Sequence, residues 1–128
     1  MNLLVDTHLL LWAAGEPQRL SKAARQLLEA LESQLWFSAA SLWEVAIKHA
    51  LGRDDFRVEP NRLRRALAAN GWHELAISSD HALATAGLPA IHKDPFDRIL
   101  IAQAMIEGIT LLTADVIVAQ YAGPIRKI

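Results

Sequence analysis

Cysteine is absent from the 128 residues, so the chain can form neither a disulfide nor a thiolate metal site. This absence is consistent with a reducing cytoplasm, which is the compartment we expect. No apolar run is long enough to cross a bilayer. The apolar start Leu3–Val5 is interrupted by Asp6 and has no basic segment before it. The sequence therefore predicts neither a membrane segment nor a signal peptide.

The sequence also lacks an excess of charge of either sign, since its formal net charge is -1 at pH 7. A protein with this charge that binds a polyanion has to use a local patch or a metal ion. The hydrophobic fraction of 52% and the charged fraction of 21% are ordinary for a globular domain with a substantial core. We expect a single domain over residues 1–128, without a linker or an internal repeat.

Short apolar runs alternate with helix-forming segments along the chain. Strands are expected at Leu3–Val5, Leu35–Ser38, Trp72–Ile77, Thr110–Thr113 and Ile125–Ile128. Helices are expected at Leu9–Ala14, Ser21–Ser33, Ala40–Leu51, Asn61–Asn70, Ser79–Ala86, Pro95–Glu107 and Val116–Tyr121. The segment 52–60 between them is polar and is expected to form a loop. This alternation predicts an α/β fold with a mainly parallel central sheet.

The predicted helix at Pro95–Glu107 is apolar on more than one face and begins between two carboxylates. Asp94 is a good N-cap, Pro95 suits the first helical position, and Gly108 suits the end. Apolar residues on several faces indicate a helix packed on several sides, with Asp97 in its first turn. Asp94 and Asp97 also resemble a capping box, and this segment alone does not decide between capping and chemistry.

Three further acids occupy positions where ligands often bind. Asp6 and Asp115 follow predicted strands, and the carboxyl edge of a parallel sheet is a common ligand site. Glu44 lies among apolar residues, where an ionised carboxylate needs a partner or a metal. Each acid also has an ordinary alternative, which is helix capping for Asp6 and Asp115 and an ion pair with Lys48 for Glu44. Oxygen ligands without cysteine favour Mg²⁺ or Mn²⁺ over Zn²⁺.

Four ordered segments resemble the motifs of PIN-domain nucleases, and particularly of the VapC-like toxins of toxin–antitoxin pairs. They are Leu3–His8, Ser41–Val45, Asp94–Arg98 with Ile101–Ala104, and Leu111–Asp115. The resemblance implies a PIN-like three-layer fold and a quartet of metal-binding catalytic acids, namely Asp6, Glu44, Asp97 and Asp115. It further implies that one or two Mg²⁺ or Mn²⁺ ions assist cleavage of RNA phosphodiester bonds. A homodimer and an antitoxin that blocks the acid site are implied as partners.

Several polar neighbours of these acids are candidates for supporting roles. Thr7 and Thr113 could orient an acid or a water, or could form ordinary strand-end hydrogen bonds. Arg98 could contact the RNA backbone or bridge to Asp94. Asp94 is interpreted as a cap that could also support the metal ligands.

Histidines, arginines and tryptophans give weaker indications. His8 and His92 could touch phosphate, although solvated loop histidines are the favoured interpretation. The arginines of the 61–70 helix could hold RNA or could form a solvated face. The four tryptophans are interpreted mainly as core residues, with one or two in an interface.

Two other functions remain open from the residues alone. A metal-dependent phosphatase or phospho-acceptor domain would use Asp6, but such phosphatases usually carry a second aspartate two positions later, where this chain has His8. A non-catalytic binding module would use the acids only as helix caps. Phospho-aspartate formation would indicate the former, and a failure to bind Mn²⁺ would indicate the latter.

Overall fold

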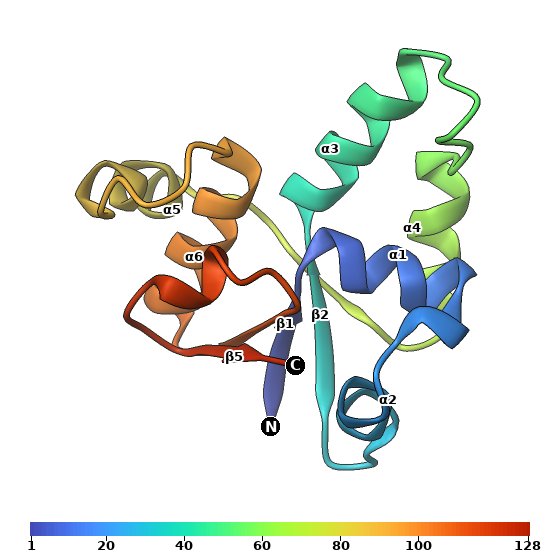
Figure 1. Ribbon diagram of the computed structural model, residues 1–128, viewed down its shortest axis with the longest axis horizontal. Coiled ribbons are helices and arrows are strands. Elements are labelled where there is room, and N and C mark those ends of the chain that lie inside the picture. Colours follow the sequence, from blue (N-terminus) through green and yellow to red (C-terminus); the bar gives the residue numbers. More distant parts are fainter.

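The computed structural model describes residues 1–128 and contains one five-stranded sheet between layers of helices (Figure 1). The strands are β1 (Asn2–Val5), β2 (Gln34–Ser38), β3 (His73–Leu75), β4 (Thr110–Thr113) and β5 (Ile125–Lys127). Their order is β3-β2-β1-β4-β5, and every pairing is parallel. β1 is central because its three apolar residues are fully buried, as expected for a strand covered on both faces.

Alternate side chains of the strands divide the core into two parts. The helices are α1 (Thr7–Gly15), α2 (Lys22–Glu29), α3 (Ala39–Ala50), α4 (Pro60–Ala69), α5 (Ser79–Ala84) and α6 (Pro95–Glu107). Val5 and Leu112 pack with residues of α1 to α4, whereas Leu4 and Leu111 pack with residues of α6. Figure 1 shows α5 and α6 on the side of the sheet opposite α1, α2 and α4. The three-layer α/β prediction is confirmed.

α6 begins and ends at the residues that the sequence predicts. The Asp94 carboxylate accepts a hydrogen bond from the Phe96 N–H, and Pro95 occupies the first helical position. Gly108 ends the helix with a φ of 66°, a left-handed conformation that glycine adopts without steric cost. The body of the helix, residues 100–104, is buried. Apolar as it is, neither α6 nor any other helix has the length and apolarity that a membrane crossing requires.

Two predicted helices are shorter than expected. α2 ends at Glu29 because Ala30 is already extended, and Leu31, inside the predicted helix, is exposed. The final predicted helix forms only a 3₁₀ turn at Val118–Gln120, because Tyr121 is extended and leads toward β5. Two more 3₁₀ turns, Pro17–Arg19 and Thr85–Gly87, connect helices.

The tryptophans lie at the margin of the core and not at its centre. Trp12, Trp36 and Trp72 are partly buried and pack against the two core clusters. Trp43 on α3 is 62% exposed and is therefore not a core residue, which the prediction allows for one or two of the four tryptophans. Its ring contacts the edge of Phe96 at the start of α6.

Candidate metal centre

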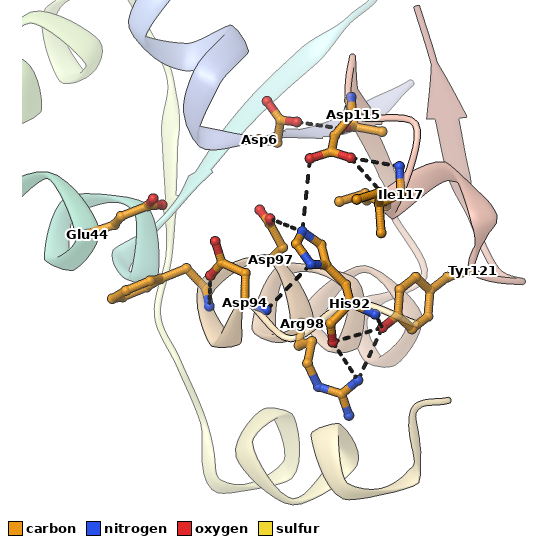
Figure 2. A network of polar contacts seen from close by, with 12 residues as sticks. Asp6, Glu44, His92, Asp94, Asp97, Arg98, Asp115, Ile117 and Tyr121 are labelled. Carbon is orange, nitrogen blue, oxygen red and sulfur yellow. Dashed lines mark hydrogen bonds and ion pairs between the residues drawn. The ribbon is translucent and has the colours of Figure 1, made fainter. Parts of the chain in front are cut away.

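The carboxyl ends of the central strands and the N-terminus of α6 meet at one edge of the sheet. Asp6 directly follows β1, Asp115 lies shortly after β4, and Asp97 is in the first turn of α6. Glu44 comes from α3, which starts directly after β2. Figure 2 shows Asp6, Asp97 and Asp115 around a common space, with Glu44 at its side. The negative charges of Asp6 and Glu44 both act on Asp97, so the fold brings the predicted acids together.

Both carboxylate oxygens of Asp6 accept hydrogen bonds, one from the start of α1 and one from Thr113. One carboxylate oxygen accepts the Leu9 N–H at 3.0 Å and caps α1, and the other accepts the Thr113 hydroxyl. Burial raises the pKa of Asp6, although the bonds from Thr113 and Leu9 oppose this. Thr7 does not orient an acid, because its hydroxyl lies 2.9 Å from the Ser41 hydroxyl and joins α1 to α3.

Asp97 faces the acid cluster and is not part of a capping box. The cap of α6 is Asp94 alone, whereas Asp97 Oδ2 lies 2.8 Å from His92 Nε2. Burial and, to a smaller extent, the charge of Asp94 raise the pKa of Asp97 to about 6, and His92 opposes the shift. A carboxyl with this pKa loses its proton near neutral pH, and a bound cation favours that loss.

Asp115 and Glu44 each show their ordinary pairing and still face the cluster. Asp115 Oδ1 accepts the backbone N–H groups of residues 117–118, so it caps the turn as the alternative predicts. Its Oδ2 lies 4.0 Å from His92 Nε2. Glu44 is 7% exposed and forms the predicted ion pair with Lys48 at 3.0 Å. Neither pairing engages all the oxygens of its carboxylate.

Arg98 is engaged by other parts of the protein, which rules out its predicted bridge to Asp94. It forms no ion pair with Asp94, and its Nη1 and Nη2 atoms instead donate to the backbone carbonyls of Thr85, Leu88, Pro89 and His92 and to the Tyr121 hydroxyl. Tyr121 Oη in turn accepts the His92 N–H at 2.8 Å. Because the terminal nitrogens bond to the protein, Arg98 anchors the 85–92 loop (Figure 2), whereas contact between Arg98 and RNA stays a prediction.

The prediction of a solvated His92 is wrong. Its side chain is 18% exposed, and its ring lies between Asp97 and Asp115. The sequence offers one weak indication, a histidine two positions before the Asp94 cap.

A buried polar bond between Ser38 and Gln103 was also missed. The Ser38 hydroxyl donates to Gln103 Oε1 at 2.6 Å, and both residues are fully buried. This bond joins the end of β2 to α6. Gln103 is the single polar residue in the run Ile99–Ile106, and this feature of the sequence could have indicated the bond.

The donor atoms at this edge fit a divalent cation. His92, Asp94 and Asp97 each place one donor atom within 4.8 Å of the others. Carboxylate oxygens are the ligands that Mg²⁺ and Mn²⁺ prefer. Burial raises the pKa values of Asp6 and Asp97, and a bound cation would offset the negative charge that burial and repulsion disfavour.

Comparison with known proteins places this geometry in a family. The model of the PIN domain matches residues 3–124. The chain belongs to the PIN-domain family. This PIN domain is 30% identical over 123 residues to Ribonuclease VapC22 of Mycobacterium tuberculosis. The matched region covers 89% of this chain and 87% of that protein. The VapC-like resemblance of the sequence is confirmed.

Solved structures share the PIN fold over nearly the whole chain. VapBC2 from Rickettsia felis, bound to a DNA fragment from its promoter, superposes with a TM-score of 0.72 at 13% identity and covers 99% of this chain and 98% of that one. A toxin–antitoxin complex from Klebsiella pneumoniae gives a TM-score of 0.67 at 23% identity, covering 98% and 99%. At these identities the likeness shows the fold, and it confirms the PIN-like architecture.

Proposed function

We propose that this PIN domain is a divalent-metal-dependent ribonuclease and the toxin of a toxin–antitoxin pair. The observation that carries the proposal is the gathering of Asp6, Glu44, Asp97 and Asp115 at one sheet edge. It occurs in a chain that is similar to a VapC ribonuclease over most of its length. The phosphatase alternative has no second aspartate beside Asp6, and the binding-module alternative does not account for Asp97, which caps nothing.

Asp6 and Asp97 are the proposed direct ligands of Mg²⁺ or Mn²⁺, and Glu44 and Asp115 contribute to a second ion or act through water. When bound, the ion offsets the charge of a phosphodiester and lowers the pKa of the attacking water. The protein's part is to hold the carboxylates in place before the ion arrives. Thr113 fixes one oxygen of Asp6, and the backbone of α1 fixes the other. Residues that hydrogen-bond to metal ligands orient those ligands in this way in metal sites.

A groove of about 460 Å³ contains Glu44, Lys48, Lys93 and Asp94 in its lining, so it borders the acid cluster at Glu44. Lys93 is exposed, and Lys48 stands beside Glu44 at the groove wall. Because the protein has a net charge of -1, RNA binding requires local positive charge, and these lysines supply it. We infer that the RNA backbone follows this groove and that its scissile phosphate lies at the acids.

An antitoxin and a second copy of this chain are the proposed protein partners. The Klebsiella structure is a toxin–antitoxin complex, which supports the antitoxin. Trp43 and Ile47 on α3 and Leu51 at its C-cap recur every four residues and are 62%, 41% and 65% exposed. A contiguous apolar stripe of this kind favours burial against another protein. Light scattering at micromolar concentration should show a mass above 14.1 kDa, and a strict monomer would contradict the homodimer.

The ribonuclease assignment is tested by replacing single carboxylates. Asp6→Asn and Asp97→Asn should abolish Mn²⁺-dependent cleavage of a single-stranded RNA, with the circular dichroism spectrum unchanged. The matched control is Asp54→Asn, which changes an exposed carboxylate in the loop before α4. Full activity in either cluster variant would overturn the assignment.

Asp94→Asn separates capping from metal binding. Asparagine caps a helix nearly as well as aspartate, so this variant should keep much of the activity. A loss as large as that of Asp97→Asn would mean that Asp94 itself binds the metal.

A further inference from the structure

His92 brings a nitrogen atom into a cluster that is otherwise made of carboxylates. Its Nε2 lies 2.8 Å from Asp97 Oδ2 and 4.0 Å from Asp115 Oδ2 (Figure 2). An octahedral ion with bonds of roughly 2.1 Å places adjacent ligands about 3.0 Å apart and opposite ligands about 4.2 Å apart. The separation of Nε2 from Asp97 Oδ2 is therefore close to that of two adjacent ligands of one ion, and one donor atom of Asp94 also lies within 4.8 Å of donor atoms of both residues.

The position of the His92 ring is built into the fold. The Tyr121 hydroxyl accepts the His92 N–H at 2.8 Å, and Arg98 donates to the His92 carbonyl. Arg98 also binds the Tyr121 hydroxyl at 3.1 Å, so the backbone on both sides of the ring is held. The Asp94 N–H also donates to Nδ1 at 3.5 Å, and this bond is about as long as the 3.4 Å bond from Arg98 to the His92 carbonyl. These contacts hold His92 so that Nε2 of its ring points toward Asp97.

We propose that His92 is a nitrogen ligand of the metal, beside Asp97, and that it biases the site toward a transition-metal ion such as Mn²⁺ over Mg²⁺. The proposal rests on the proposed metal-dependent function and names a ligand beyond the acid quartet. The bias follows because imidazole nitrogen binds transition metals well, whereas Mg²⁺ strongly prefers oxygen ligands.

The direct test is pulsed electron paramagnetic resonance of the protein loaded with one equivalent of Mn²⁺. The echo envelope should show ¹⁴N modulation from a bound imidazole, and His92→Gln should remove it. His8→Gln is the matched control, since His8 also neighbours an acid but is exposed on α1, and the modulation should persist there. Labelling all histidines of the unaltered protein with ¹⁵N should replace the ¹⁴N pattern, which tests for an imidazole ligand without a substitution at position 92.

Calorimetry provides the second readout. Loss of a residue that only hydrogen-bonds to a metal ligand already lowers metal affinity by about tenfold. Loss of a ligand in His92→Gln should therefore weaken Mn²⁺ binding by at least about tenfold. Mg²⁺ binding should weaken by a smaller factor. Mn²⁺ bound without ¹⁴N modulation, modulation that survives His92→Gln, or equal losses for both ions would overturn the role of His92 while leaving the proposed function standing. A wild-type protein that binds no Mn²⁺ would instead overturn the metal-dependent function itself.

Discussion

Asp97→Asn should make the metal-free protein more stable at neutral pH. Burial and the charge of Asp94 raise the pKa of Asp97 from 3.8 to about 6, so ionising this carboxyl disfavours the folded state. A shift of this size corresponds to about 3 kcal/mol, at about 1.4 kcal/mol per pKa unit. The side chain is 19% exposed, so solvent screening reduces the expected gain to about 1–2 kcal/mol.

The gain should depend on pH in one direction. Because the folded pKa of Asp97 lies above its unfolded value of 3.8, the folded wild-type protein holds an extra proton between those pKa values. Wild-type stability therefore falls, through this group, as pH rises from about 4 to about 6. The variant lacks the group, so its advantage is complete above about pH 6 and small near pH 4.

Urea unfolding in EDTA at pH 7.5 and pH 4.5 measures this difference. Asp97→Asn should exceed wild type by about 1–2 kcal/mol at pH 7.5 and by about a third of that at pH 4.5. Asp54→Asn should match wild type at both values. Saturating Mn²⁺ should stabilise wild type and have little effect on Asp97→Asn. No gain in stability at pH 7.5, or the same gain at both pH values, would refute the view that ionised Asp97 destabilises the folded protein.

Three further predictions concern the support of the site and its substrate. Arg98→Lys keeps the charge but cannot reproduce the bonds to the 85–92 loop, so RNA cleavage should fall about 10- to 100-fold; wild-type activity would show that the charge alone suffices. Ser38→Ala leaves Gln103 buried without its partner and should lower the free energy of unfolding by about 1–3 kcal/mol in urea titrations, and an unchanged value would argue against the buried bond. Binding of a short non-hydrolysable single-stranded RNA should require a divalent ion and weaken with a log–log salt slope of about -2 to -3; tight binding without the ion, or a steeper slope, would reveal a basic surface outside the groove.

Local sequence signals were sufficient for the elements that carry the acids. Asp94, Pro95 and Gly108 determine the ends of α6 through capping and backbone geometry, which act within a few residues. Asp6 and Asp115 could be placed at one edge because consecutive βα units make the sheet parallel. The acid cluster follows from these local rules combined with topology.

The surroundings of the acids depend on contacts that local patterns do not encode. His92 and Arg98 both bond to the Tyr121 hydroxyl, 29 and 23 residues away in the chain. The only indication in the adjacent sequence is that His92 lies two positions before the Asp94 cap, and this does not distinguish a histidine held in this way from a solvated one. Likewise, Thr7 could have faced Asp6 or Ser41, and only the packing of α1 against α3 decides between them.

The most direct test of the metal-dependent ribonuclease is cleavage of a fluorescent single-stranded RNA by EDTA-treated wild-type protein as Mn²⁺ is added back. The clustered acids predict no cleavage without the ion and cleavage that rises and saturates as the ion is added. Cleavage in EDTA at the same rate, or no cleavage at any Mn²⁺ concentration by protein that binds the ion, would contradict this function.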